Sequence, residues 1–179
     1  MKNKLIKVTG DLSTLNEKER REKILDFESL LSQQKGAYFG DSPLCPLIHR
    51  FADGIYVREI FIPKGTHAVG KIHKCSHPVF LMSGTIELVT EAGGCEVLTG
   101  PLSIISAPGT KRAARAVTDV VWITVHSNPT NTQDLKELES IVIADSYEAY
   151  DKFLERRENR VVKFLDKIIR GVQLKLTGS

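Results

Sequence analysis

The sequence PKGTHAVGKIHKCSHPVFLMSG, residues 63–84, holds three of the chain's five histidines between a Pro-Lys-Gly-Thr turn and a Ser-Gly turn. Alternate residues of a β-strand share a face, so His67, Lys71 and His73 are predicted to point to the same side. His77 follows at the head of the next apolar run. The stretch therefore predicts a β-structure in which imidazoles and an ammonium group converge.

A β-strand sequence pattern continues on both sides of this stretch. Short β-branched and aromatic runs, separated by Gly, Pro and Asp, are typical of an all-β sandwich or barrel. The predicted strands are Gly54 to Ile62, His67 to His73, Val79 to Thr90, Glu96 to Leu98, Leu102 to Ser106, and Arg112 to His126 with a break near Asp119.

Helical patterns flank this β region. On the N-terminal side, Thr14 followed by Glu17 matches a capping box, and Gly36 ends an apolar pattern of helical spacing. Near the C-terminus, the stripe from Val161 to Val172 predicts an amphipathic helix with a basic polar side, which is either solvated or a dimer or phosphate contact. The sequence thus predicts an N-terminal helical segment (1–36), a β-barrel (37–128) and a C-terminal helical extension (129–179).

The composition fits a globular domain and excludes several classes of protein. The chain has 179 residues, 41% hydrophobic and 26% charged, with a net charge of +3 that requires no polyanionic partner. No run approaches the roughly 18 apolar residues of a membrane helix. Lys7 interrupts the apolar start, so no export signal is expected. Three cysteines without paired spacing favour reduced thiols and a cytoplasmic protein. Zinc-finger, helix-turn-helix and RNA-binding signatures are absent, so a nucleic-acid partner is not expected.

The region from about Ile55 to His126 resembles the cupin superfamily of small β-barrels. Counted back from Gly84, the spacing of the first cupin motif puts His77 at a glutamate position and His73 at a histidine position. Around Gly100 and Pro108-Gly109 the second motif is matched, with Arg112 in place of its histidine. The resemblance implies a mainly β fold, a single cupin-like jelly-roll barrel with an N-terminal helix and a C-terminal helical extension. The four positions that hold metal in metal-binding cupins carry Lys71, His73, His77 and Arg112 here.

Only some of these four residues can bind a metal ion. Arginine has no lone pair to donate, and lysine binds a metal only after losing its proton. His73 and His77 remain, and His67, or His126 if it faces inward, could supply a third nitrogen. A metal-dependent cupin enzyme using iron, zinc or manganese is therefore one hypothesis.

The cationic side chains at metal-ligand positions support a different hypothesis, which the sequence favours. Lys71 and Arg112 would cost several kcal/mol each to bury unpaired, so they need water, an internal carboxylate (Glu59 or Glu87) or an anionic ligand. The sequence then predicts a non-catalytic protein with a cationic pocket for a phosphate- or carboxylate-bearing molecule. No catalytic residue and no cofactor is predicted under this hypothesis. The predicted ligand-binding residues are Lys71, His73, His77, Arg112, His67, Trp122 and His126, although a lone tryptophan on a strand more often belongs to the core.

Two broader expectations complete the analysis. The segment from Trp122 to Thr130 resembles small cupin proteins of tailed bacteriophages, which implies sequestration of a nucleotide-derived immune signal in the host cytoplasm. A homodimer is expected, because barrels with an exposed edge strand and an apolar helix often pair. The remaining alternative is a scaffold or assembly protein whose helices make the contacts.

Overall fold

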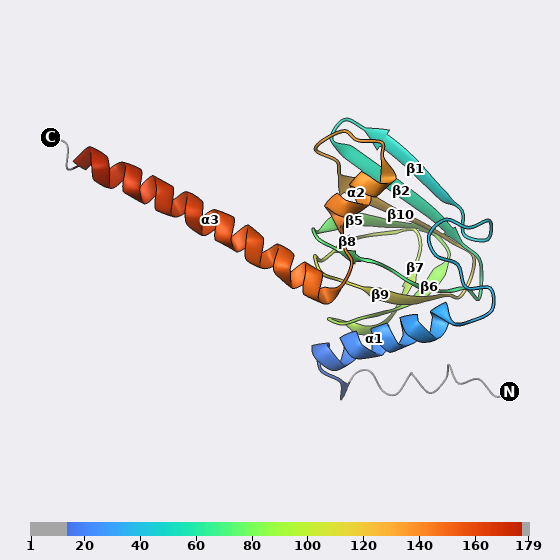
Figure 1. Cartoon of the computed structure of the whole chain (residues 1–179). Coiled ribbons are helices and arrows are strands. Elements are labelled where there is room, and N and C mark those ends of the chain that lie inside the picture. Colours follow the sequence, from blue (N-terminus) through green and yellow to red (C-terminus); the bar gives the residue numbers. More distant parts are fainter. Residues whose placement is uncertain (1–13, 177–179) are drawn as a thin grey trace.

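The computed structural model describes the backbone of residues 14–176 and the side chains of residues 14–169. Two antiparallel sheets face each other and three helices lie around them (Figure 1). The sequence start, with the interpretation based on Lys7, lies outside the described residues. Among those residues, no helix combines the length and hydropathy that crossing a membrane would need.

The strand order is that of a jelly roll. The five-stranded sheet has the order β1 (Leu47–Ala52), β2 (Ile55–Ile62), β10 (Val120–Ser127), β5 (His77–Ser83) and β8 (Leu102–Ser106). The four-stranded sheet has the order β3 (His67–Val69), β9 (Arg112–Ala116), β6 (Thr85–Thr90) and β7 (Gly94–Thr99). Leaving β1 aside, eight strands form two facing four-stranded layers in the orders β2-β10-β5-β8 and β3-β9-β6-β7, as in a jelly roll. The prediction of a mainly β, jelly-roll fold with flanking helices is confirmed.

Several predicted boundaries differ from the structure. The run predicted as one strand from Val79 to Thr90 forms β5 and β6, because Gly84 turns the chain with a φ of +87°. Only glycine fits there, since a Cβ atom would lie 2.0 Å from the carbonyl oxygen of Asp119. Strand β1 was not predicted.

The first helix, α1 (Glu17–Ser32), also begins differently from the prediction. Its N-cap is Asn16, whose side chain accepts a hydrogen bond from the Glu19 amide at 3.0 Å, while the Glu19 carboxylate accepts from the Asn16 amide at 2.8 Å. A capping box is therefore present, two residues after the predicted one. Helix α1 lies against the outer face of the four-stranded sheet, where Ile24 is fully buried (Figure 1).

The C-terminal extension joins the barrel through a short strand. Helix α2 (Leu135–Val142) leads into β11 (Ile143–Ala144), which pairs with β4 (Ile72–His73), and α3 (Tyr147–Leu176) follows. Tyr150 of α3 packs on Ile72 and Ala144, and the rest of the helix projects away from the barrel (Figure 1).

The space between the sheets has an apolar and a polar part. Six fully buried residues form the apolar part: Ile62, Leu81, Ile86, Leu88, Ala116 and Val120. Burial of each larger side chain stabilises the fold by about 1.5–3 kcal/mol. This core leaves the other part of the interior to histidines and arginines.

Candidate metal and anion site

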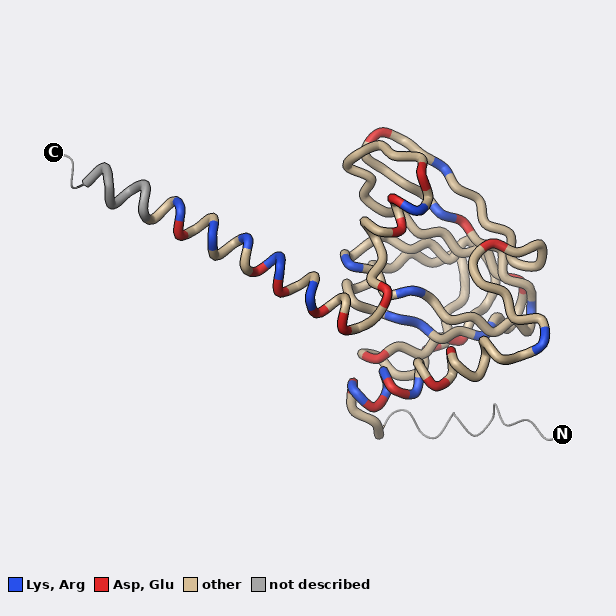
Figure 2. Tube along the Cα trace, viewed as in Figure 1, with Lys and Arg blue, Asp and Glu red and all other residues tan. Residues whose placement is uncertain are grey.

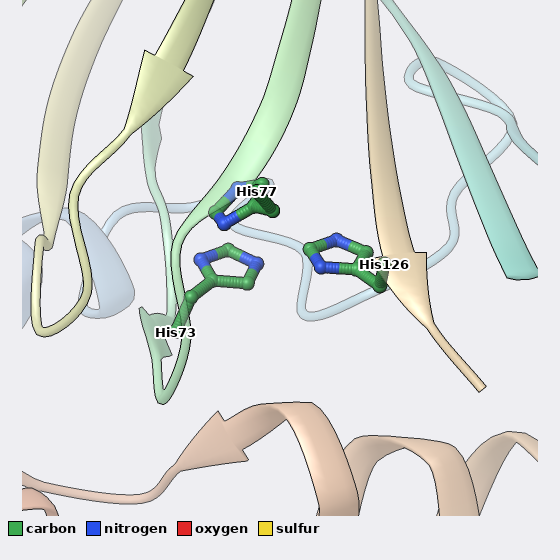
Figure 3. Close-up of side chains that lie close together, drawn as sticks. All are labelled: His73, His77 and His126. Carbon is green, nitrogen blue, oxygen red and sulfur yellow. The ribbon is translucent and has the colours of Figure 1, made fainter. Parts of the chain in front are cut away.

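Three histidines from three different strands meet inside the fold. His73 comes from β4, His77 from the start of β5 and His126 from the end of β10 (Figure 3). One ring nitrogen from each lies within 4.8 Å of those of the other two. The ring centroids are 4.3 Å apart for His73 and His77, 4.5 Å for His77 and His126, and 4.9 Å for His73 and His126.

Backbone pairing holds these rings in place. His73 pairs with Ile143 of β11, and its carbonyl accepts a hydrogen bond from the Gly109 amide at 2.8 Å. His77 lies opposite Ser106 of β8, and His126 lies opposite Tyr56 of β2. The C-terminal extension therefore takes part in fixing a histidine of the barrel.

Two of the ring nitrogens have no hydrogen-bond partner. The Nδ1 atom of His77 lies 3.2 Å from the Cys75 carbonyl, which only accepts hydrogen bonds, so Nδ1 carries the proton and Nε2 keeps its lone pair. The Nε2 atom of His77 and the Nδ1 atom of His73 are both buried without a partner. Because buried polar atoms are almost always paired, these two nitrogens fit a site for a cation.

The three imidazoles are neutral at physiological pH. Burial, strengthened by the neighbouring imidazoles and Arg58, lowers the pKa of His73 to about 2 and that of His126 to about 3. Burial also lowers the pKa of His77. Three neutral imidazoles are a donor set that suits zinc, iron and other divalent transition metals, so this cluster could hold a metal ion.

A cavity of about 140 Å³ borders the cluster between the two sheets. Its apolar wall includes Ile60, Ile86 and Leu88. The polar residues that line it are Arg58, Lys71, His73, His77, Arg112, Trp122 and Thr124, the tryptophan being polar only at its ring nitrogen. None of the lining residues is a carboxylate.

The two arginines keep their charge inside this cavity. Burial lowers the pKa of Arg58 and of Arg112, yet a guanidinium stays protonated at neutral pH. The Nη2 atom of Arg112 donates a hydrogen bond to Ser106 Oγ at 2.8 Å. Among the described residues, no carboxylate forms a salt bridge with either arginine.

The carboxylates considered from the sequence do not reach the cavity. Glu59 pairs with Arg50 at 2.8 Å, and Glu87 pairs with Arg115 at 2.8 Å. Both pairs lie on outer faces of the sheets, because the neighbouring Arg58 and the inward-facing Ile86 alternate with them. The positive charge inside the fold therefore has no carboxylate partner among the cavity-lining residues.

The other predicted site residues lie in different parts of the site. Lys71 lines the cavity, but it is exposed and its Nζ atom forms an ion pair with Glu139 of α2. Trp122 forms part of the cavity wall and packs on the core. His126 faces inward and completes the histidine cluster.

His67 does not reach this cluster. Its ring is exposed on β3 and lies edge-on to Phe27 of α1, with the ring centroids 6.1 Å apart. The predicted alternation from His67 to His73 fails, because the chain leaves the strand at Gly70 and Lys71 before β4 begins. The expectation that both imidazoles share one face was wrong.

Sequence reasoning missed Arg58. In the run IYVREIFI of β2, Tyr56 and Ile62 are buried, and Arg58 and Ile60 share their inward face. The period-two pattern was present in the sequence, but Arg58 falls on none of the motif positions that drew attention to Lys71 and Arg112.

Comparisons with known proteins were made for the sequence and for the structure. No family model and no curated protein matches the sequence. Solved structures with similar folds include an ectoine synthase from P. lautus (17% identity, TM-score 0.41, 48% of this chain and 65% of that chain). The cupin domain of Cnp3 from Schizosaccharomyces pombe is also similar (11% identity, TM-score 0.42, 50% of this chain and 69% of that chain). A salicylate 1,2-dioxygenase from Pseudoaminobacter salicylatoxidans is similar over 69% of this chain and 34% of that chain, at 16% identity and a TM-score of 0.46.

These likenesses concern folds alone. The chain covers less than two thirds of the ectoine synthase and about a third of the dioxygenase, so neither activity is carried over. The jelly roll assigned above rests on the strand order of this chain. The resemblance to bacteriophage proteins stays a prediction.

Proposed function

We propose that this chain binds one divalent transition-metal ion through His73, His77 and His126, and that it binds a small organic anion in the adjoining cavity. The buried, unpartnered Nε2 atom of His77 carries the first part of the proposal. Its orientation is fixed by the Cys75 carbonyl on the other side of the ring, as is usual for metal-ligating histidines.

The arginines support the second part. Arg58 and Arg112 line the same cavity as His73 and His77, and an anion bound there would offset the cost of holding two cations away from bulk water. A planar guanidinium binds carboxylate or phosphate through two parallel hydrogen bonds. The hydrogen bond from Arg112 to Ser106 holds one guanidinium nitrogen and leaves the others available. A metal bound by three imidazoles would keep a coordination position for an oxygen of the same anion.

The size of the cavity limits the anion. Pockets for drug-sized ligands usually measure about 300–1,000 Å³, and this cavity measures about 140 Å³. A small carboxylate or phosphate with a short apolar part fits the charges and the isoleucine-lined wall. The volume favours such a ligand over the nucleotide-derived signal that the bacteriophage resemblance implies.

A metal-dependent enzyme is the second candidate function. Three protein ligands with an open position are the pattern of catalytic zinc sites, whereas structural sites are closed by four ligands. However, the lining residues include no carboxylate that could act as a general base beside the histidines. We therefore propose binding, with turnover of a small carboxylate as the alternative.

The test is the metal content of the protein prepared without a polyhistidine tag. After incubation with Zn²⁺, Fe²⁺, Mn²⁺ or Co²⁺ and gel filtration, we expect about one ion of at least one of these metals per chain. His77→Ala should retain less than about a tenth of that amount. His67→Ala is the matched control and should retain all of it, because His67 lies outside the cluster.

Two results would contradict the proposal. One is a wild-type protein that retains none of the four metals. The other is equal loss from His67→Ala and His77→Ala, with circular dichroism showing that both variants are folded.

A further inference from the structure

The two sheets differ in what covers their outer faces. Helix α1 lies on the outer face of the four-stranded sheet (Figure 1). Within residues 14–176, the main helix contacts with strands are those of α1 with β3, β6 and β9, and those of α2 and α3 with β11. The outer face of the five-stranded sheet therefore has no helix packed along it in the described part of the chain.

This uncovered face is apolar. Arg58 and Trp122 point into the cavity, so their neighbours in β2 and β10 point outward. Ile105 is 70% exposed and Met82 is 50% exposed. The apolar residues with outward register across the five strands are Ile48, Val57, Phe61, Pro78, Phe80, Met82, Ile105, Val121, Ile123 and Val125.

The face carries almost no net charge. Its charged residues are Arg50 and Glu59, which pair with each other at 2.8 Å. An exposed apolar patch that extends over several strands usually marks an interaction site. A partner for it needs an apolar surface and no particular charge.

Helix α3 has an uncovered apolar surface as well. Its first turns pack on the barrel through Tyr150 and Leu154. The same side of the helix continues beyond the barrel, where each of the large apolar residues is about half exposed: Val161, Val162, Phe164, Leu165, Ile168 and Ile169. An isolated projecting helix is only marginally stable in water, and packing of its apolar side against another surface would stabilise it.

The projecting part of α3 is about as long as the five-stranded sheet is wide. Its backbone from Val161 to Leu176 comprises 16 residues, which gives a length of about 24 Å. Five strands spaced about 4.8 Å apart span about 20–24 Å. The projecting helix is therefore long enough to cross the sheet.

A single chain cannot bring these surfaces together. Tyr150 anchors the start of α3 near β4 and β11, where its ring also packs against Gly109. From there the helix projects away from the barrel (Figure 1). A helix that covers the sheet in this way would have to come from another copy.

Charge favours a sheet over a second helix as the surface that α3 contacts. Basic residues outnumber acidic ones along the exposed length of α3 (Figure 2): from Arg156 to Lys167 it carries Arg156, Arg157, Arg160, Lys163 and Lys167 against Glu158 and Asp166. Two such helices packed together would therefore bring an excess of positive charge close. On the neutral sheet face, the same basic residues would stay in water.

We propose that two copies of this chain form a reciprocal dimer in which the exposed stripe of each α3 packs across the outer face of the partner's five-stranded sheet. A twofold axis makes the two contacts identical, so each copy covers both of its uncovered apolar surfaces at once. The proposal is independent of metal or anion binding.

The test measures molar mass by light scattering during gel filtration at about 10–100 µM full-length protein, a range in which specific dimers are populated. We expect a dimer for the wild-type protein, and monomers for Leu165→Glu in the helix and for Phe80→Glu in the sheet. Val97→Glu is the matched control, because Val97 is 62% exposed on β7 of the other sheet, and it should stay dimeric. Circular dichroism and metal content show whether each variant is folded.

Other outcomes would overturn the proposal. A monomeric wild-type protein would do so, whether or not it binds vesicles of anionic phospholipid. A dimer lost in Leu165→Glu but kept in Phe80→Glu would mean that helices pair with helices. A dimer lost in Phe80→Glu but kept in Leu165→Glu would mean that sheets pair face to face.

Discussion

The histidine cluster and the arginine pair lie beside one cavity, and burial affects them in opposite ways. Burial lowers the pKa of His73 to about 2, so its imidazole is neutral and has a lone pair to donate. Burial lowers the pKa of Arg58 as well, yet its guanidinium remains a cation. The same loss of water thus leaves neutral imidazoles on one side of the cavity and fixed positive charge on the other.

The sequence left a metal site and a cationic pocket as alternatives, because Lys71 and Arg112 occupy positions that hold metal ligands in cupins. In the structure, His126 lies beside His73 and His77, and Arg112 lines the adjoining cavity.

Removal of His126 should have the largest effect. His126→Ala leaves two imidazoles, and we expect metal affinity to fall by about 100-fold or more, measured by competition with a chromophoric chelator. His67→Ala should change the affinity by less than about twofold, because it alters no ligand. An unchanged affinity in His126→Ala would show that the ion is bound elsewhere.

Replacement of Arg58 should weaken anion binding and leave metal binding intact. Arg58→Met removes the charge but keeps an apolar side chain, and affinity for a small carboxylate such as oxalate should fall about 10- to 100-fold by calorimetry. Arg115→Met, on an outer face, is the control. If both variants bind the carboxylate equally well, the arginine side of the cavity has no part in binding.

The metal-free protein should lose stability in acid. The pKa values of His73 and His126 are about 2 and about 3 in the folded state, below their unfolded value of about 6.5. The unfolded state therefore binds more protons between about pH 3 and 6.5, and the free energy of unfolding should fall with falling pH by up to about 1.4 kcal/mol per unit for each histidine.

Urea denaturation from pH 7 to 5 measures this slope. His126→Ala should show a shallower slope than wild type, and His67→Ala the same slope as wild type. Equal slopes in all three proteins would mean that His126 is protonated in the folded state.

Lys71 should contribute least. Its Nζ atom pairs with Glu139, and its side chain is 59% exposed, so water screens its charge. We expect Lys71→Met to change carboxylate affinity by less than about threefold in the same calorimetric assay. A loss as large as that of Arg58→Met would place Lys71 among the main anion-binding groups, as first predicted from the sequence.

Much of the fold could be predicted, because β patterning and glycine turns are local signals. His73 and His77 were also accessible from motif spacing. His126 depended on strand phase, which the pattern of β10 does not reveal. The inward face of β10 carries Thr124 and His126, whereas Val121, Ile123 and Val125 on the outward face are all apolar, so hydrophobicity alone would turn His126 outward.

The errors have a common physical origin. The prediction for His67 assumed one continuous strand, whereas the chain turns at Gly70 and Lys71. Arg58 was missed because no motif position falls on it, and only the fold places it in the cavity wall. Both depend on tertiary structure, which residue order alone does not provide.

The central claim is that three imidazoles hold one metal ion beside the cavity. Anomalous diffraction from crystals soaked in Zn²⁺ and measured at the zinc edge tests it most directly. We predict one peak about 2.0–2.1 Å from a nitrogen of each of His73, His77 and His126. A peak held by other residues, or none at this cluster in fully soaked crystals, would contradict the account.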